Sequence, residues 1–333
     1  MPKISIIMPV YNKQDYIQRS LDSVLNQDFS DFELIAVDDG SKDNSLQILE
    51  EYRSKDSRIK VIHTDNHGVS HARNRGLDNC EGEYLTFVDA DDELKCGYLS
   101  SLLNILQQSG ADIVIQGITK VYPDGSTKDI SSEIKDGVYP LSSLMPDFAK
   151  TQKSTGIFGY CFSKLFSTSL TNDIRFDEEL NLAEDFDFYL KMYRKIETVY
   201  FNSVSNYLYS QSLPGASADI NDEDIDYKGQ FTINCRYRKY MIDTGYYYGN
   251  NKSIIMGMIN SSAYHMLFYS DTFDIKNKCA LLKEKAEVFE NIMSGKLFQN
   301  TVLRAAINGN YRTVKMLIKA YKAVRAVKRR LVS

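Results

Sequence analysis

The chain has 333 residues, of which 43% are hydrophobic and 25% charged, with only 6 prolines and 18 glycines, so fibrous and disordered classes are excluded. The net charge of −4 is uneven, because residues 311–333 carry +8 with no acid and residues 1–310 therefore carry −12. An acidic body argues against a general role in nucleic-acid binding.

Residues 1–120 alternate between short apolar runs and segments with helical periodicity. The apolar runs predict buried strands at 4–8, 32–37, 59–63, 84–88 and 112–116. Helices are expected between them, near 16–25, 46–52, 70–79 and 94–108, with Ser41 or Asp43 capping the second. Parallel neighbours require such crossovers, so the pattern predicts an α/β fold whose mainly parallel, Rossmann-like sheet is covered by helices on both faces.

Beyond residue 120 the pattern changes. Residues 121–125 predict a hairpin turn, and 198–201 and 207–209 predict short strands. The sequence is helical from about residue 222 onward. We therefore expect one domain over residues 1–220 and a helical extension over residues 221–333.

The extension ends in a basic amphipathic segment. In residues 311–333, one helical face carries Val314, Leu317, Ile318, Tyr321 and Val324, and another carries Lys315, Lys319, Lys322 and Arg329. This pattern predicts peripheral contact with an anionic membrane, and docking of the basic helix on the acidic body is the alternative.

Targeting signals are not evident in the sequence. It lacks an apolar run of membrane-spanning length, and the start turns polar too soon for a secretory signal. The expected location is the cytoplasm, at the inner face of the cell membrane.

Polar residues follow four of the expected strands. Ligands of open α/β sheets bind outside the carboxyl ends of the strands. The four turns are Pro9–Asn12, Asp38–Ser41, Asn66–Gly68 and Asp89–Asp92. They predict a binding site at one edge of the sheet.

Asp89 and Asp91 lie two residues apart at the end of a strand, so in extended backbone their side chains point the same way. Carboxylates presented in this way suit Mg²⁺ or Mn²⁺ together with substrate phosphates. A solvated acidic turn is the alternative. A calcium loop is excluded because Leu94 stands where that motif needs glycine, and the dinucleotide and P-loop glycine motifs are absent.

Several ordered motifs resemble one known family. They are Ile6–Asn12, Leu21–Gln27, Val37–Asp43, Asn66–Leu77 and Val88–Asp92, followed by Ser163–Phe166, Ile174–Phe176 and Ala183–Asp185. In this order and spacing they resemble the inverting nucleotide-sugar glycosyltransferases of family 2, of the bacterial surface-polysaccharide type with the GT-A fold. The resemblance covers about two-thirds of the chain.

The resemblance implies a pocket for a nucleotide-sugar donor, most simply a UDP-sugar. Pro9 and Tyr11 would line the base pocket, and Asp39 would hydrogen-bond the base edge. The remaining residues expected to contact the donor are Asn12, Asn66 and Ala90.

The resemblance also implies the reacting groups. Arg73 would lie near the diphosphate, Asp91 would contact Mn²⁺ or Mg²⁺, and Asp89 would hold the ribose, the metal or a metal-bound water. Asp185, with Glu184 beside it, would act as the general base that takes the proton of an acceptor hydroxyl. The reaction would be a non-processive hexosyl transfer with inversion.

The expected acceptor is a saccharide, lipid-linked or glycoconjugate hydroxyl in polysaccharide or capsule assembly, and the helical extension could form a dimer contact. Three alternatives compete with this interpretation. A non-catalytic partner subunit would not need all four of the acidic residues Asp39, Asp89, Asp91 and Asp185. A nucleotidyltransferase would carry a glycine-rich basic loop after the first strand. A glycosidase would use two carboxylates but would not need the second acidic turn, Asp38–Ser41, which suits a nucleotide. Ser210 departs from the family, since many members have arginine there.

Overall fold

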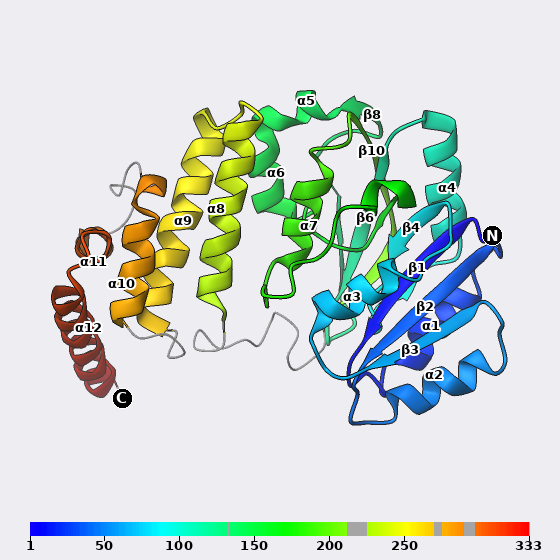
Figure 1. The fold of residues 1–333 in the computed structure, drawn as a ribbon, viewed down its shortest axis with the longest axis horizontal. Coiled ribbons are helices and arrows are strands. Elements are labelled where there is room, and N and C mark those ends of the chain that lie inside the picture. Colours follow the sequence, from blue (N-terminus) through cyan, green and yellow to red (C-terminus); the bar gives the residue numbers. More distant parts are fainter. Residues whose placement is uncertain (132, 212–224, 270–274, 290–296, 333) are drawn as a thin grey trace. The chain divides into compact units, whose positions relative to one another are not determined.

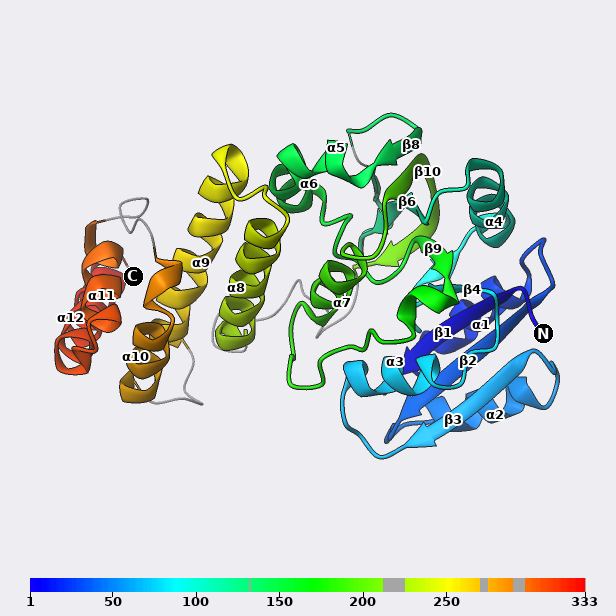
Figure 2. The ribbon, with the colours of Figure 1, turned by 45° about the horizontal axis from the view of Figure 1, so that its top comes forward.

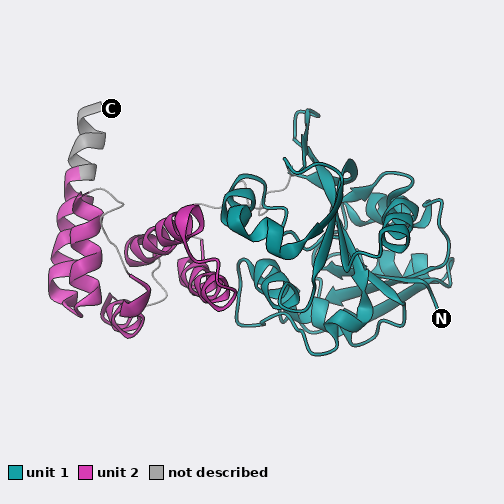
Figure 3. Ribbon diagram, turned by 90° about the horizontal axis from the view of Figure 1, so that it is seen from above, with its two compact units in different colours: residues 1–218 teal, residues 219–333 magenta. Residues whose placement is uncertain are grey.

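The computed structural model describes residues 1–131, 133–211, 225–269, 275–289 and 297–332 (Figure 1). The chain divides into two compact units, Met1–Ala218 and Asp219–Ser333 (Figure 3). Each unit has its own secondary structure and is described separately below.

Unit 1 is built on a single mixed sheet. Its strands are β1 (Ile4–Val10), β2 (Phe32–Asp39), β3 (Ile59–Thr64), β4 (Tyr84–Phe87), β5 (Glu93–Leu94), β6 (Ile113–Val121), β7 (Thr127–Ile130), β8 (Gly137–Pro140), β9 (Lys164–Ser167) and β10 (Thr198–Ser210). The main path runs β3-β2-β1-β4-β9-β6-β10-β5, while β7 pairs with β6 and β8 with β10. The predicted α/β class is confirmed.

One half of the sheet is entirely parallel. Strand β1 pairs in parallel with β2 and β4, and β2 pairs in parallel with β3. The register sets Val10 opposite Asp38 and Asp39 opposite Thr64. The carboxyl ends of the four strands therefore meet at one edge, where the polar turns follow them.

Helices cover both faces of this half (Figures 1 and 2). The helices of unit 1 are α1 (Ile17–Leu25), α2 (Ser45–Arg53), α3 (Val69–Leu77), α4 (Tyr98–Ser109), α5 (Leu141–Leu144), α6 (Phe148–Thr155) and α7 (Glu184–Met192), with 3₁₀ turns at Met145–Asp147 and Thr168–Thr171. Alternate residues of β1, such as Ile6 and Met8, enter one core cluster with Leu21 of α1 and Leu99 of α4. On the other face, Gly76 of α3 packs so closely on Ile7 that an added Cβ would lie 2.4 Å from its Cγ2 atom.

The other half of the sheet departs from a parallel pattern. Strand β9 lies antiparallel between β4 and β6, and β6 pairs in parallel with β10. The hairpin turn predicted at 121–125 joins β6 to β7. The strands expected at 198–201 and 207–209 are parts of one strand, β10, which continues through two register irregularities.

The helix expected at 94–108 begins later than predicted. Glu93 and Leu94 form β5, and α4 starts after Gly97, whose φ of 87° is left-handed. The N-cap residue of α2 is Asn44, and its side chain makes no capping hydrogen bond, so neither Ser41 nor Asp43 is the cap. Asp43 accepts a hydrogen bond from the N–H of Ser45 (2.9 Å), the first residue of α2, whereas Ser41 accepts from the N–H of Asn12.

Unit 2 is helical throughout its described residues. Its helices are α8 (Tyr227–Asp243), α9 (Gly249–Tyr269), α10 (Ile275–Glu284), α11 (Leu297–Ile307) and α12 (Tyr311–Val332), with a 3₁₀ turn at Ala286–Val288. Helices α8 and α9 form a packed pair, and α10, α11 and α12 contact one another. Over the ranges that the structure describes, none of the helices is long and apolar enough to cross a membrane.

Candidate active site

A cavity of about 500 Å³ opens at the carboxyl ends of β1, β2, β3 and β4. It is lined by Pro9, Val10, Tyr11, Lys13, Asp39, Asn66, Gly68, Val69, Ala72, Arg73, Asp89, Ala90 and Asp91. Eight of the residues that the sequence singled out thus share one cavity of a size that suits a small ligand.

Three of the predicted residues are not among those lining the cavity. They are Asn12, Glu184 and Asp185. Asn12 has a φ of 52° and ties two loops together, because its N–H donates to Ser41 Oγ (3.0 Å) and its Oδ1 accepts from the N–H of Lys42 (2.7 Å). Asn12 is therefore an exposed residue that connects this turn to the loop after β2, and the side chain of Tyr11 beside it remains 43% exposed.

Asp39 organises the turn between β3 and α3. Its Oδ1 accepts from the N–H of His67 (3.0 Å), and its Oδ2 accepts from the N–H of Gly68 (2.7 Å). Gly68 has a φ of 95°, which only glycine adopts without strain. Oδ1 also accepts from Thr64 Oγ1 (3.3 Å). A carboxylate oxygen has two lone-pair sites, so Oδ2 of Asp39 can still accept one more hydrogen bond from a ligand in the cavity.

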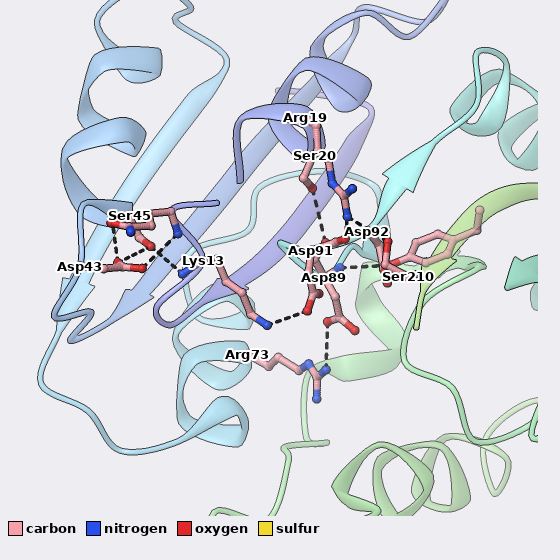
Figure 4. Close-up of polar contacts among 12 residues, drawn as sticks. Lys13, Arg19, Ser20, Asp43, Ser45, Arg73, Asp89, Asp91, Asp92 and Ser210 are labelled. Atoms are coloured by element: carbon pink, nitrogen blue, oxygen red, sulfur yellow. Dashed lines mark hydrogen bonds and ion pairs between the residues drawn. The ribbon is translucent and has the colours of Figure 1, made fainter. Parts of the chain in front are cut away.

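The Asp89–Asp91 turn faces two cations (Figure 4). Lys13 Nζ donates to Asp91 Oδ2 at 2.6 Å, and Arg73 Nη2 lies 3.2 Å from Asp89 Oδ1. Sequence reasoning did not single out Lys13, although it directly follows the Pro9–Asn12 turn. Both carboxylates are therefore neutralised within the cavity by side chains from α3 and from the loop after β1.

Arg73 is the centre of a buried ion cluster. Only 4% of its side chain is exposed, and its Nη1 atom donates to Glu184 Oε1 (2.9 Å) and to Asp185 Oδ1 (2.5 Å). With Asp89 on its other nitrogen, one guanidinium binds three carboxylates. Arg73 thereby joins the cavity to the Glu184–Asp185 pair, which begins helix α7 behind it.

Local backbone geometry presents this acidic pair. Ala183, immediately before α7, adopts a left-handed φ of 61°, and Glu184, Asp185 and Asp187 occupy the first helical turn. Acids are stabilised there by the positive end of the helix dipole. Burial is the main reason that the pKa of Asp185 is raised well above its usual value; Arg73 opposes the shift, and the neighbouring carboxylates add to it.

The cavity fits a divalent ion held in part by substrate. In the described part of the chain, no group of three or more His, Cys, Asp or Glu side chains could enclose a metal. Asp89 and Asp91 nevertheless offer hard oxygen ligands side by side, and Lys13 shows that a cation is favourable at Asp91 Oδ2. Two carboxylates completed by phosphate oxygens and water form a usual Mg²⁺ or Mn²⁺ site.

Lys164 is a buried cation near the same cluster. It begins β9, is 1% exposed, donates to the Tyr160 carbonyl and lies 4.4 Å from the ring centroid of Tyr189. Burial lowers the pKa of Lys164 to about 7, and the charges of Cys161 and Asp185 oppose that shift. The motif Ser163–Phe166 was noted in the sequence, but nothing in it indicates that the lysine points inward.

Sequence comparison assigns the family. Residues 5–174 match the family described as Glycosyl transferase family 2. This match spans just over half of the chain and includes every cavity-lining residue. The chain belongs to glycosyl transferase family 2.

Two relatives show where the family likeness extends. The uncharacterized glycosyltransferase EpsJ of Bacillus subtilis (strain 168) is 34% identical over 222 residues, which are 66% of this chain and 64% of EpsJ. The poly(ribitol-phosphate) beta-N-acetylglucosaminyltransferase TarS of Staphylococcus aureus (strain Mu50) is 32% identical over 233 residues, 68% of this chain and 39% of TarS. The chain thus spans less than two-thirds of either relative.

The fold is shared with a solved member. The crystal structure of S. aureus TarS 1-349 in complex with UDP-GlcNAc superposes with a TM-score of 0.64 and 22% identity, covering 96% of this chain and 92% of that one. The predicted GT-A architecture, a mostly parallel sheet followed by C-terminal helices, is therefore confirmed at the level of the fold.

Replacing Lys164 with methionine should change how stability depends on pH. A lysine whose folded pKa lies near 7 binds fewer protons in the folded than in the unfolded chain between about pH 7 and 10.5. The wild type should therefore gain stability relative to Lys164→Met as pH rises through that window, by at most about 1.4 kcal/mol per pH unit. Urea unfolding at a series of pH values measures the difference.

Lys150→Met is a suitable control, because Lys150 is an exposed lysine of unit 1. Its difference from the wild type should not grow in the same way. Parallel pH profiles for the wild type and Lys164→Met would show that Lys164 is not held in a desolvating environment.

Proposed function

We propose that this protein is a metal-dependent, inverting glycosyltransferase that moves one sugar from a nucleotide-sugar, a UDP-sugar, to an acceptor hydroxyl. The observation that supports this function best is the connection made by Arg73. It links a cavity that contains Asp39, Asp89 and Asp91 to the Glu184–Asp185 pair.

The cavity residues suit a nucleotide. The exposed ring of Tyr11 offers a stacking surface for the base, beside Pro9. Asp39 can accept a hydrogen bond from the base edge through the free lone pair of Oδ2. Asn66 and the buried Ala90 complete the wall next to the ribose position.

The cations of the cavity suit a diphosphate. Lys13 and Arg73 place positive charge where negative charge develops as the sugar leaves the nucleotide. Asp91, with Asp89, would hold Mn²⁺ or Mg²⁺. When bound, such an ion stabilises the charge of the leaving diphosphate as a Lewis acid.

Asp185 is the proposed general base. Its side chain is 23% exposed, so it can accept the proton of an acceptor hydroxyl that attacks the anomeric carbon opposite the diphosphate. Attack from that side inverts the anomeric configuration. Arg73 orients the carboxylate through Oδ1, and burial raises the pKa of Asp185, which makes the carboxylate a stronger proton acceptor.

The domain roles follow from this assignment. Residues 1–220 would form the GT-A catalytic domain and residues 221–333 the helical extension. TarS carries the name of a transferase acting on poly(ribitol-phosphate), which supports an acceptor in surface-polysaccharide or glycoconjugate assembly. The alternative is a non-catalytic partner subunit, which would have no need for the three carboxylates that Arg73 binds, Asp89, Glu184 and Asp185.

Nucleotide binding tests the function directly. UDP with Mn²⁺ should raise the melting temperature of the wild type more than GDP, CDP or dTDP, because a ligand of the native state stabilises it by mass action. In Asp91→Asn, most of the rise in melting temperature that requires Mn²⁺ should be lost. Asp15→Asn, an exposed acid that does not line the cavity, is the control. If no nucleotide raises the melting temperature of the wild type, the proposed function is rejected in favour of a non-catalytic partner subunit.

The role of Asp185 has a separate test. Asp185→Asn keeps an oxygen for Arg73 but cannot take a proton, so kcat should fall by about 10²–10⁴-fold. UDP with Mn²⁺ should still raise the melting temperature of this variant. Wild-type activity should rise with pH through a pKa above the usual carboxyl range, because the base works deprotonated. Rates of sugar transfer from a panel of UDP-sugars to saccharide acceptors measure both the kcat of the variant and the pH dependence of the wild type. Near-normal turnover by Asp185→Asn would assign the base elsewhere.

The basic helix α12 supports peripheral membrane contact. Its expected apolar face is partly used within unit 2, since Val314 and Ile318 are buried and Tyr321 stacks on Phe298 at 5.1 Å. Lys315, Lys319 and Lys322 are exposed. We therefore propose an electrostatic attachment to anionic lipid, the surface where a lipid-linked acceptor would lie, at the cytoplasmic face of the membrane.

Charge removal on α12 tests this attachment. Changing Lys315, Lys319 and Lys322 together to glutamine should weaken co-sedimentation with anionic vesicles by about tenfold or more, since each cation near the surface contributes roughly 1 kcal/mol. The same change at three exposed lysines of unit 1, Lys55, Lys128 and Lys150, is the control. Equal binding by both triple variants would reject α12 as the contact.

A further inference from the structure

The turn that carries Asp89 and Asp91 is held from behind by β10. The hydroxyl of Tyr207 accepts a hydrogen bond from the N–H of Asp89 (3.1 Å) and donates to Asp92 Oδ2 (2.7 Å). The other oxygen of Asp92, Oδ1, accepts from the N–H of Ser210 at the end of β10 (2.8 Å). Two side chains thus join the main chain of the turn to the main chain of the strand.

Helix α1 adds a second attachment on the same side (Figure 4). Arg19 Nη2 donates to the carbonyl oxygen of Asp91 (3.0 Å) and to Ser210 Oγ (3.1 Å). Ser20 Oγ lies 3.4 Å from the carbonyl oxygen of Asp89. The carbonyl groups of the two residues that flank Ala90 are therefore both in contact with side chains of α1.

These groups are distinct from the cavity. Arg19, Asp92, Tyr207 and Ser210, here called the loop brace, are not among the residues that line it. Tyr207 and Asp92 are 0% and 1% exposed, so water does not compete for their hydrogen bonds. The ring of Tyr207 is held independently, stacked on Phe162 with centroids 4.3 Å apart.

We propose that the loop brace is a set of positioning residues for the donor site. It sets the direction of the Asp89 and Asp91 carboxylates by holding the backbone that carries them. This inference rests on the proposed function, because it assigns the brace a role in binding a nucleoside diphosphate with a divalent ion. Ser210 belongs to it through its N–H and hydroxyl, and Arg19 brings a guanidinium to that hydroxyl from α1.

The brace separates a polar role from a packing role within one side chain. Tyr207→Phe keeps the ring on Phe162 but removes the hydroxyl that accepts from the N–H of Asp89 and donates to Asp92 Oδ2. A role in packing alone predicts that binding is unchanged by this substitution. A positioning role predicts weaker binding of the ligand that Asp89 and Asp91 hold.

The matched control is Tyr98→Phe. Tyr98 is also fully buried, with its ring centroid 6.0 Å from that of Tyr207, but its hydroxyl lies 3.2 Å from Thr86 Oγ1 of β4. Calorimetric titration with UDP and Mn²⁺ should show at least about fivefold weaker binding for Tyr207→Phe, the effect of one ordinary hydrogen bond, and wild-type affinity for Tyr98→Phe. Thermal unfolding of both variants gives their loss of stability.

A second variant removes the attachment from α1. The side chain of Arg19 is 40% exposed, so Arg19→Gln should leave the core intact and should also weaken UDP–Mn²⁺ binding. Wild-type affinity in both Tyr207→Phe and Arg19→Gln would overturn the brace. The absence of UDP binding by the wild-type protein would instead overturn the proposed function on which the brace rests.

Discussion

The ion cluster around Arg73 is the interaction on which the site depends. A buried guanidinium is stable only when its charge and its donors are matched, and removing one partner from such a pair typically costs about 3–5 kcal/mol. Arg73 meets this constraint with carboxylates from two separate parts of unit 1, Asp89 after β4 and the pair that starts α7. The same contacts that compensate its burial also bring the proposed base and the proposed metal ligands to one point.

Cationic side chains lie on two opposite sides of the Asp89–Asp91 turn. Lys13 and Arg73 lie on the cavity side, where they neutralise the two carboxylates and would meet a diphosphate. Arg19 lies on the opposite side and binds the main chain of the turn. Carboxylates that must accept a divalent ion repel one another, so an arrangement that holds their backbone while leaving their oxygens toward the cavity keeps the site formed before the ligand arrives.

Much of the parallel half of unit 1 could be predicted from local sequence. The strands at 4–8 and 32–37 are mostly apolar and are buried along their whole length, as expected for a parallel sheet covered on both faces. The strand at 59–63 is less apolar and only partly buried. The antiparallel strands were harder to predict. Strand β9, Lys164–Ser167, is only four residues long and pairs with β4 and β6, so its identity depends on neighbours distant in sequence. The start of α4 depends on the left-handed Gly97, which periodicity does not detect.

The sequence by itself determined the family, the α/β fold and the four polar turns, because strand ends and motif spacing are local properties of the chain. Tertiary structure decided which charges meet. Arg73 and Asp185 are 112 residues apart, and Arg19 and Ser210 are 191 apart, so no spacing rule could pair them. It also decided that Asn12 binds the loop after β2 and that Lys164 points inward, since the direction of a side chain depends on the space that packed elements leave for it.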